Sequence, residues 1–472
     1  MKRWEDDAWE KSMSIKIDFS NVIVENVGEN TGLSVSEIND LGEKASQIHE
    51  QLNYEREKGK LGFYELPYRE SSVKEIREVA ERIRGEFKNL VVLGIGGSAL
   101  GTIAIKNALE NPFSDSNTTK VFVADNVDPH YFGSLLESIN IEETCFLVIS
   151  KSGTTAETMS QFMVVHEMIK NAGRENSISR QLIAITDPEK GCLREIALQE
   201  NYTTLTIPPS VGGRFSVLSP VGLLPSAVMG IDIDEMLAGA RFMDSRCSSH
   251  QLWQNPAYTL GSVYYLADTM KRQNILVFMP YSNGLYGIAD WLRQLIAESL
   301  GKRKSLDGKD VFVGPTPVKS LGTTDQHSQL QLYMEGPFNK IITFFRVETF
   351  SKKVPIPNEF PDIDALNYLG GKSLNDLINA EQKATAIALA KNGRPNITIS
   401  VPEINPFTIG QLFFLFEVMT VYVGALYNIN PLDQPGVEES KKNTYAIMGR
   451  KGYEERAKEI KNELSGNPNF VV

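Results

Sequence analysis

Short apolar segments rich in β-forming residues alternate with longer segments of helical pattern along most of the chain. This alternation is typical of α/β proteins, in which crossover helices join parallel strands. The predicted strands fall into two groups, 90–94, 121–124, 145–150, 182–186 and 203–207, then 275–279, 311–313, 341–347 and 397–401. Since 472 residues is about three times the length of a typical domain, we predict two parallel-sheet units in one chain.

The connection between the two groups of strands is expected near 230–252, a polar helical stretch that follows an apolar run. The chain would then have four regions: an N-terminal helical arm at 1–60, a first sheet domain at 61–235, a second at 236–407 and a C-terminal helical arm at 408–472. The apolar stretch 412–426 is shorter than the roughly 20 residues of a membrane span and carries Glu417. We expect it to be a buried core helix.

The formal net charge of −11 is spread along the chain, which argues against a nucleic-acid or anionic-membrane partner. The three cysteines, Cys145, Cys192 and Cys247, are far apart and odd in number, as expected in a reducing, cytoplasmic compartment. The charged N-terminal sequence MKRWEDDAWE lacks the apolar run of a secretion signal. The five histidines form no short-range pair with one another or with a cysteine, so no metal site is expected.

The first predicted strand ends in a glycine-rich turn at 94–101, with the sequence GIGGSALG, where free backbone N–H groups and a helix dipole favour an anion. Gly97 and Ser98 are the candidate binding residues. Taken alone, this turn allows three interpretations: a phosphate site, a tight turn without a ligand, or the dinucleotide site of a dehydrogenase. The dehydrogenase would use Asp125, at the end of the next strand, to bind a ribose.

The third predicted strand leads into a second turn, whose candidate phosphate ligands are Ser150, Lys151, Ser152, Thr154 and Thr155. A helix cap explains one hydroxyl residue here, but hardly four beside a glycine. Because the carboxyl ends of parallel strands share one edge, the two turns can converge on one anion. Compact hydroxyl donors suit a phosphate monoester better than a pyrophosphate. The sequence therefore favours a single sugar-phosphate site.

These two turns, with the motifs described next, resemble the phosphoglucose isomerase family, in the same order along most of the chain. The resemblance implies an α/β fold of two sugar isomerase (SIS) domains, each with a parallel five-stranded sheet flanked by helices, plus the two helical arms. It also implies an aldose–ketose isomerase that interconverts D-glucose 6-phosphate and D-fructose 6-phosphate through a cis-enediolate, in glycolysis and gluconeogenesis. No cofactor and no metal are implied.

Moving a carbonyl between C1 and C2 of a sugar requires ring opening, removal of a proton beside the carbonyl and stabilisation of an enediolate. A candidate base is Glu298, which shares the polar face of an expected helix with Asp290 and Gln294. Periodicity alone predicts that this face contacts water. The next residues, SLGK at 299–302, resemble the helix end that carries the family's carbon base. This match implies Glu298 as the base and Gln294 as a substrate contact.

Two polar loops supply a histidine and an arginine. The segment 322–330, GTTDQHSQL, resembles the family's ring-opening histidine motif, although a lone histidine is more often structural. The match implies that His327 acts as acid and base in the site of the neighbouring subunit of a homodimer. The segment 211–216, VGGRFS, resembles the arginine motif, which implies Arg214 as the enediolate stabiliser with Gly213 beside it.

The last motif lies near the C-terminus, in the sequence LDQPGVEESK at 432–441. By itself a lysine among glutamates is typical of a solvated surface. The resemblance implies that Lys441 assists ring opening and that Gln434 contacts the phosphate or the sugar. Pro435 stands where animal relatives often have tryptophan, which points to the bacterial branch of the family.

Other functions remain open from the sequence. A sugar-phosphate-binding regulator would keep the two turns but would not need the base, the histidine and the arginine. An isomerase with additional mannose 6-phosphate activity would keep every motif. A glutamine-dependent synthase on the same scaffold would need an N-terminal cysteine nucleophile, where this chain has Lys2 after Met1.

Overall fold

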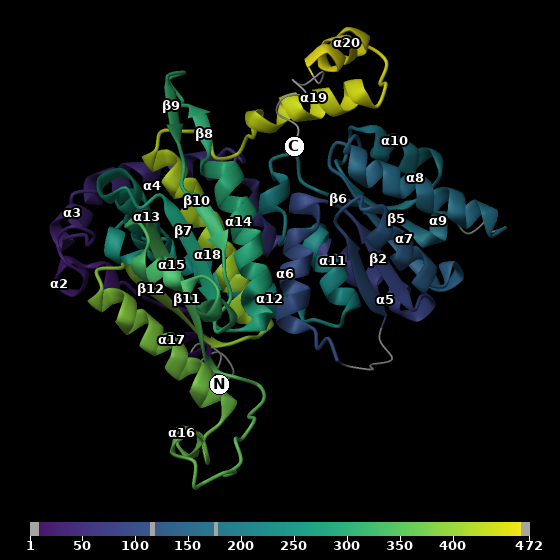
Figure 1. Ribbon diagram of the computed structural model, residues 1–472. Coiled ribbons are helices and arrows are strands. Elements are labelled where there is room, and N and C mark those ends of the chain that lie inside the picture. Colours follow the sequence, from purple (N-terminus) through teal and green to yellow (C-terminus); the bar gives the residue numbers. More distant parts are fainter. Residues whose placement is uncertain (1–8, 114–118, 174–177, 464–472) are drawn as a thin grey trace, which may run out of the picture.

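The computed structural model describes residues 9–113, 119–173 and 178–463, so the charged N-terminal residues 1–8 lie outside the described part. Two α/β halves lie side by side in Figure 1. The first half holds a five-stranded sheet in which every neighbouring pair of strands is parallel. Its order is β3 (Lys120–Ala124), β2 (Asn89–Leu93), β4 (Thr144–Ile149), β5 (Leu182–Thr186) and β6 (Thr203–Thr206). All five strands predicted for this half are confirmed.

Helices flank the first sheet: α5 (Glu70–Glu86) precedes its first strand, α11 (Pro220–Val228) follows its last, and the others connect successive strands. The connecting helices are α6 (Leu100–Leu109), α7 (Pro129–Ser138), α8 (Ala156–Asn171), α9 (Ile178–Gln181) and α10 (Cys192–Gln199). Strands β4 and β5 are buried on both faces, which explains their nearly continuous apolar sequence.

The second half also holds a five-stranded sheet, but this sheet is mixed. Four strands are parallel neighbours, in the order β12 (Asn396–Glu403), β11 (Lys340–Thr349), β7 (Ile275–Pro280) and β10 (Thr316–Lys319). The fifth, β1 (Lys16–Asp18), comes from the N-terminal region and pairs with β12 in antiparallel fashion. Therefore the α/β prediction is confirmed, while the second sheet is not parallel throughout.

One predicted strand belongs elsewhere. The 311–313 segment lies in β9 (Asp310–Val313), which pairs with β8 (Lys302–Lys304) in a separate two-stranded hairpin. The edge of the second sheet beside β7 is formed instead by β10, whose second residue is Pro317. Proline cannot donate a backbone hydrogen bond and is tolerated at sheet edges, so β10 carries little strand signal in its sequence.

Helix α18 (Pro406–Leu426) forms the centre of the second half, and nearly all of its side chains are buried. It packs against α12 (Ile233–Arg246), α13 (Pro256–Lys271) and α14 (Tyr286–Leu300). The rings of Phe413 on α18 and Trp291 on α14 meet edge to face at 4.8 Å. Among the described helices, α18 is the one with the length and composition to cross a membrane, but it is enclosed by protein. The expected buried core helix is confirmed.

Helices α6 and α14 join the two halves. Gly287 on α14 lies so close to α6 that an added Cβ would be 2.8 Å from the Cα of Ala104. One hydrophobic cluster continues across this contact, from Leu90 and Val92 of the first sheet to Phe278 and Phe345 of the second. Helix α14 is therefore held firmly against the first half.

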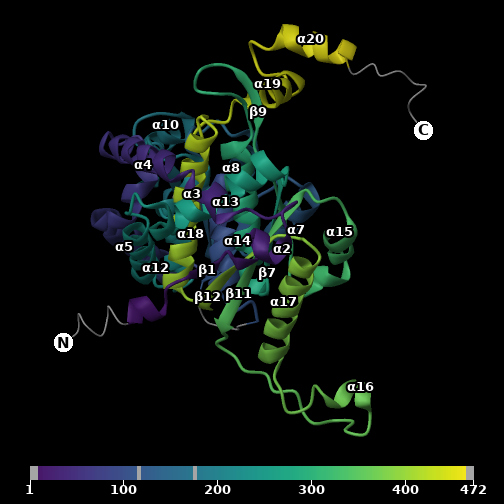
Figure 2. The same cartoon turned by 90° about the vertical axis from the view of Figure 1, so that its left-hand side faces the viewer.

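The remaining helices lie at the periphery. The N-terminal region contains α2 (Val24–Val27), α3 (Val35–Asn39) and α4 (Gly42–Glu57), and the second sheet is flanked by α15 (Leu330–Glu335) and α17 (Leu374–Lys391). Figure 2 shows two projections at opposite ends of the molecule. One is the extension between β11 and α17 that carries α16 (Asp364–Asn367), and the other is formed by α19 (Glu438–Ile447) and α20 (Glu454–Glu463).

Candidate active site

The hydroxyl-rich turn follows β4, as the sequence predicts. The backbone N–H of Gly153 donates to Ser150 Oγ at 3.1 Å, and Ser150 Oγ lies 3.1 Å from Thr155 Oγ1. The N–H and the hydroxyl of Thr154 both donate to Ser152 Oγ, at 3.2 and 3.0 Å. Gly153 has a positive φ of 64°, and a Cβ there would lie 2.2 Å from the backbone nitrogen of Leu193. This turn therefore requires glycine and gathers its hydroxyl groups at one point.

Helix α8 begins at this turn with its N-terminus uncapped. Its N-cap residue, Thr155, makes no capping hydrogen bond, and the hydroxyl of Thr158 in the first turn is buried without a hydrogen-bond partner among the described residues. Free N–H groups at the start of a 16-residue helix favour an anion. The turn thus has the hydrogen-bond donors and the dipole direction that a phosphate needs.

Lys441 lies beside this turn. A cavity of about 110 Å³ separates them and is lined by Ser152, Thr154, Thr155, Ala156, Glu157, Lys441, Thr444 and Tyr445. The ammonium group of Lys441 donates to Glu438 Oε1 at 2.8 Å, and both side chains are exposed. The structure therefore brings Lys441 to the hydroxyl-rich turn, although its sequence alone suggested a solvated surface.

Lys151, in the same turn, binds the segment that precedes Arg214. Its ammonium group donates to the backbone oxygens of Pro209 and Val211 at 2.6 and 3.0 Å. Burial lowers the pKa of Lys151, and the nearby Asp187 opposes that shift. Lys151 thus ties the turn after β4 to the segment that leads into Arg214.

The glycine-rich turn after β2 packs against protein groups of the same site. A Cβ on Gly97 would lie 2.2 Å from the carbonyl carbon of Gly213, so the two backbones can approach this closely only without a side chain at 97. Gly96 has a positive φ of 56°, and a Cβ there would be 2.8 Å from Gln294 Nε2. A dinucleotide site would need this approach to Gly96 for the pyrophosphate. Because Gln294 occupies it, the geometry disfavours the dehydrogenase interpretation.

Ser98 belongs to the same turn, at the end of the short 3-10 helix Gly96–Ser98. Its backbone N–H donates to Ile95 at 3.1 Å, which closes the turn. Ser98 is half-buried and stands just before α6, in a 3-10 helix that contacts the Arg214 segment.

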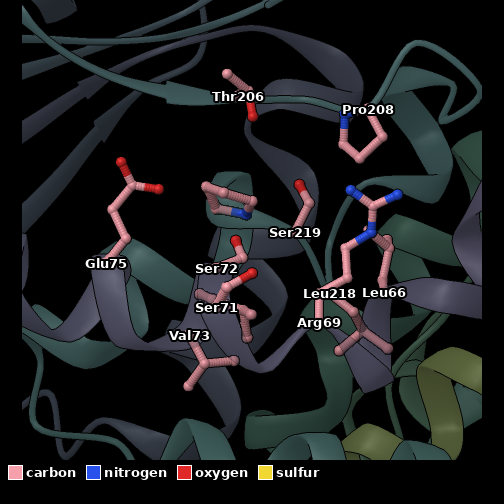
Figure 3. Close-up of a pocket in the computed structure, with 12 residues that line it drawn as sticks. Leu66, Arg69, Ser71, Ser72, Val73, Glu75, Thr206, Pro208, Leu218 and Ser219 are labelled. Atoms are coloured by element: carbon pink, nitrogen blue, oxygen red, sulfur yellow. The ribbon is translucent and has the colours of Figure 1, made fainter.

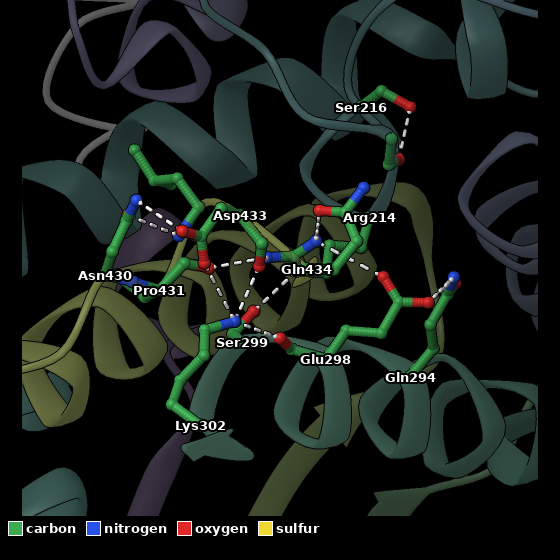
Figure 4. Close-up of polar contacts among 12 residues, drawn as sticks. Arg214, Ser216, Gln294, Glu298, Ser299, Lys302, Asn430, Pro431, Asp433 and Gln434 are labelled. Carbon is green, nitrogen blue, oxygen red and sulfur yellow. Dashed lines mark hydrogen bonds and ion pairs between the residues drawn. The ribbon is translucent and has the colours of Figure 1, made fainter. Parts of the chain in front are cut away.

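Arg214 lies in the centre of the site and its side chain is only 2% exposed. Figure 4 shows its guanidinium group among residues from separate segments of the chain. All five N–H groups donate: to Ser299 Oγ at 2.7 Å, Glu298 Oε2 at 3.2 Å, Gln434 Oε1 at 2.9 Å, Pro431 O at 2.6 Å and Asp433 O at 3.0 Å. Burial lowers the pKa of Arg214, and the carboxylate of Glu298 opposes the shift. Arg214 is thus a fixed positive charge whose guanidinium N–H groups all have hydrogen-bond acceptors.

Glu298 stands on the last turn of α14, between Arg214 and Gln294. Its Oε2 atom accepts from Arg214, and its Oε1 atom accepts from Gln294 Nε2 at 2.9 Å. About one third of the Glu298 side chain, 33%, remains exposed. The Oε1 atom of Gln294 is buried without a hydrogen-bond partner in the described part of the chain. The helix face predicted to contact water is therefore half-covered and carries an oriented carboxylate and a spare hydrogen-bond acceptor.

The sequence interpretation gave no role to Ser299 and Lys302. Ser299 is fully buried and accepts from Arg214, while Lys302 donates to the backbone oxygens of Glu298 and Asp433, both at 2.6 Å. A lysine just beyond a helix end commonly binds the last carbonyl groups of that helix. The position of Lys302 after Gly301 was therefore a signal that could have identified it.

His327 is not part of this cluster. It ends the 3-10 helix Thr324–His327, which follows β10 of the second sheet, and its side chain is exposed. Asp325 anchors the loop by accepting from Leu321 N–H and the Ser320 hydroxyl at 2.7 and 3.0 Å. Within the described residues, no hydrogen bond or ion pair joins the His327 imidazole to another side chain. The structure thus brings Arg214 and Glu298 together, places Lys441 at the hydroxyl-rich turn, and leaves His327 at the surface.

A second cavity, of about 250 Å³, lies between the first turns of α5 and α11 and is shown in Figure 3. It is lined by Leu66, Arg69, Ser71, Ser72, Val73, Glu75, Thr206, Pro208, Leu218, Ser219, Pro220 and Leu223. None of the predicted site residues is among them. This cavity therefore lies outside the proposed reaction centre.

Comparisons with known proteins agree with one another. Residues 73–465 match the family profile described as phosphoglucose isomerase. The chain is 47% identical over 467 residues to a glucose-6-phosphate isomerase of Carboxydothermus hydrogenoformans, covering 98% of this chain and 100% of that protein. It is 38% identical over 436 residues to a glucose-6-phosphate isomerase of Methanocaldococcus jannaschii, covering 92% and 99%.

Solved structures show a similar fold. A hypothetical protein from Thermus thermophilus is similar with a TM-score of 0.82 at 33% identity, covering 92% of this chain and 100% of that one. A glucose-6-phosphate isomerase from Chlamydia trachomatis is similar in fold with a TM-score of 0.72 at 24% identity, covering 84% and 77%.

Proposed function

The chain belongs to the phosphoglucose isomerase family, and we propose that it interconverts glucose 6-phosphate and fructose 6-phosphate at the site around Arg214, Gln294 and Glu298. The observation that carries this assignment of the site is the carboxylate of Glu298, which is held between two donors while 33% of the side chain stays exposed. A base must be oriented and must also reach its substrate. Glu298 meets both conditions.

The phosphate would bind at the turn after β4. Its donors would be the hydroxyl groups of Ser150, Ser152, Thr154 and Thr155 with the free N–H groups of α8, and the backbone of Gly97 and Ser98 would close the other side. Lys151 holds the next segment in place and adds positive charge. This arrangement sets the sugar between the hydroxyl-rich turn and the last turn of α14.

Proton transfer would then proceed in the open-chain sugar. Glu298 takes the proton from C2 of the aldose, and the electron pair forms the C1–C2 double bond while the carbonyl oxygen on C1 becomes the oxyanion of the cis-enediolate. The hydroxyl proton on O2 passes to O1, and Glu298 returns its proton to C1, which leaves the ketone at C2. All five N–H groups of Arg214 are engaged, so Arg214 acts mainly as a fixed charge. Its longest bond, 3.2 Å to Glu298, is the one that can yield to an oxyanion. The free Oε1 atom of Gln294 is placed to accept a sugar hydroxyl, and Gln434 to contact the substrate beside Arg214.

Ring opening would use Lys441 and His327. Lys441 already lies beside the phosphate turn, whereas His327 is exposed on its own chain. We therefore propose a homodimer in which His327 serves the site of the neighbouring subunit. The extension between β11 and α17 supports this proposal because it exposes several large apolar side chains. They are Val354, Phe360, Ile363, Leu366 and Tyr368.

We further propose that the enzyme works in the cytoplasm without a metal, and that its two domains are those expected from the sequence, at 61–235 and 236–407. The flanking regions 1–60 and 408–472 contribute β1 and most of α18 to the second half. The free cysteines Cys145, Cys192 and Cys247 are compatible with a reducing compartment.

The test is a coupled assay of the purified protein after EDTA treatment. Fructose 6-phosphate is supplied, and glucose 6-phosphate formation is read with an auxiliary dehydrogenase. Turnover without added metal supports the proposal. Absent turnover, together with measurable binding of fructose 6-phosphate, would favour the regulator instead. Mannose 6-phosphate supplied in the same way measures the selectivity.

A further inference from the structure

Lys302 is a second buried cation beside Arg214. It is the first residue of β8, directly after α14, and its side chain is only 4% exposed. Its ammonium group donates to the backbone oxygen of Glu298 at 2.6 Å, which satisfies a carbonyl group that α14 leaves free at its C-terminus. Lys302 therefore holds the turn of the helix that carries the proposed base.

The same ammonium group also binds the segment that carries Gln434. It donates to the backbone oxygen of Asp433 at 2.6 Å and lies 3.4 Å from Asp433 Oδ1. The backbone oxygen of Asp433 accepts a second bond, from Arg214, at 3.0 Å. Two buried cations thus meet at one carbonyl group, and Figure 4 shows them approaching it from different elements.

This arrangement links three segments that are far apart in the sequence. Lys302 joins α14 to the 430–434 segment, and Arg214 joins both of them to the loop after β6. If Lys302 were lost, the carbonyl groups of Glu298 and Asp433 would each lose a charged donor in a buried place, where such donors matter most. The loop could then move relative to the helix, and Arg214 would have to follow it.

The charged groups around Lys302 also couple it to Arg214 and Glu298. Burial and the neighbouring Arg214 lower the pKa of Lys302, while Asp433 and Glu298 oppose that shift. Each of the two cations is paired with a carboxylate, Arg214 with Glu298 and Lys302 with Asp433, which offsets the cost of placing two positive charges side by side in the protein interior. Loss of the Lys302 charge would therefore unbalance the charges around Arg214 and Glu298.

We propose that Lys302 is a positioning residue for the isomerisation, which fixes the 430–434 segment on the end of α14 so that Arg214 stays aligned with Glu298. The inference rests on the proposed roles of Glu298 and Arg214. Lys302 acts without touching the substrate. Its effect would therefore appear mainly in turnover and less in substrate binding, because the phosphate turn lies on the first sheet and Gln434 is the one proposed substrate contact in the 430–434 segment.

The experiment compares Lys302→Met, which removes the charge and the donor, with Lys302→Arg, which keeps both. Lys304→Met is the matched control, since Lys304 lies on the same short strand but is exposed and pairs with Asp310. We expect Lys302→Met to lose about 10- to 100-fold in kcat, the effect of a small misplacement of reacting groups, with KM within about threefold of the unmodified enzyme. Lys302→Arg should recover most of the loss, and Lys304→Met should be unaffected.

Two results would overturn the proposal. One is a kcat for Lys302→Met within about twofold of the unmodified enzyme. The other is an equal loss in Lys302→Met and Lys302→Arg, because a residue that acts through its charged donor should be rescued by another charged donor. If Lys302→Met does not fold, Lys302→Gln replaces it in the same comparison. Glu298→Gln in the same assay distinguishes failure of the proposed function from failure of this inference. Unchanged turnover of Glu298→Gln refutes the proposed function itself. A large loss in Glu298→Gln with no loss in the Lys302 variants refutes only the role of Lys302.

Discussion

The two parts of the proposed site differ in how they are built. The proton-transfer part, around Arg214 and Glu298, is assembled in the interior from long-range contacts and has nearly all of its hydrogen bonds in place. The ring-opening part consists of two exposed residues, Lys441 on the peripheral helix α19 and His327 on a surface loop. The proton-transfer part is therefore complete within the chain, whereas the ring-opening part depends on residues at the molecular surface.

This difference has a physical reason. Abstraction of a carbon-bound proton needs a base and an oxyanion partner fixed within fractions of an ångström, and close-packed interiors provide such rigidity. Ring opening transfers protons between oxygen atoms, which tolerates looser geometry and requires access for a cyclic substrate. We therefore expect substitutions in the interior part to affect every substrate, and substitutions in the exposed part to depend on the substrate form and on the neighbouring subunit.

The largest effect is expected from Glu298→Gln. The substitution keeps the shape of the side chain and removes the base, so turnover should fall on the order of 100-fold or more while fructose 6-phosphate still binds. Calorimetry measures the binding, and the coupled assay measures the turnover. The matched control is Asp290→Asn on the same helix face, where Asp290 pairs with Arg293 and Lys319. Near-normal turnover of Glu298→Gln would remove Glu298 from the mechanism.

His327→Ala should lose about 10- to 100-fold in turnover of the cyclic sugar and much less in turnover of an acyclic analogue, because only the cyclic form needs ring opening.

A second experiment, with mixed dimers of two variants, tests whether His327 serves the neighbouring subunit. If His327 serves the other subunit's site, unfolding and refolding His327→Ala together with Glu298→Gln creates one intact site in each mixed dimer. Activity should return to about one quarter of that of the unmodified enzyme. No recovery, with mixed dimers verified by mass, would place His327 in its own chain's site or in a structural role.

The next effect concerns the contact between Gly97 and Gly213. Gly97→Ala would place a Cβ against the backbone of Gly213, which cannot move aside as a flexible side chain would. We expect a loss of about tenfold in turnover and about 1–3 kcal/mol in the free energy of unfolding. Gly133→Ala is the control, because Gly133 lies in α7 with open space around it. There, alanine should be neutral or slightly stabilising. Equal behaviour of the two variants would show that the close approach is not needed.

The fold was largely predictable because its central strands are strongly apolar. Strands β4 and β5 are buried along their whole length and stand out in the sequence. Strands β1 and β10 are not recognisable in the sequence, because both are short and lie at sheet edges. Edge strands bury little side-chain surface, and their pairing depends on neighbours that no local pattern reveals.

The site was less predictable from the residues themselves. Glu298 shares a helix face whose pattern predicts solvent exposure, and only the resemblance to a known family identified it. Its covering groups come from distant segments: Arg214 lies 84 positions earlier, and Asp433 lies 131 positions after Lys302. Contacts at such separations leave no periodic signal in a sequence. The turns at the strand ends were the exception, since glycines and hydroxyl residues mark them locally.

The smallest effect on activity, and a measurable one on stability, is expected in the core that supports the interior part. Glu417 lies in the middle of α18, fully buried, and neither carboxyl oxygen has a hydrogen-bond partner among the described residues. Burial raises the pKa of Glu417 well above its ordinary value, so the folded protein retains a proton that the unfolded chain releases as pH rises above about 4.5. Stability is therefore lost as pH increases through this range.

Glu417→Gln imitates the protonated side chain at every pH. At pH 8 it should stabilise the protein by about 1–2 kcal/mol, since the folded state no longer has to retain the proton, and the gain should vanish near pH 4.5. Thermal or denaturant unfolding at both pH values measures this difference, and kcat should stay within about twofold of the unmodified enzyme because Glu417 touches no group of the site. A stability difference independent of pH would mean that Glu417 is ionised in the fold with a partner of its own. A loss of turnover would mean that the buried core and the reaction centre are coupled more tightly than their contacts indicate.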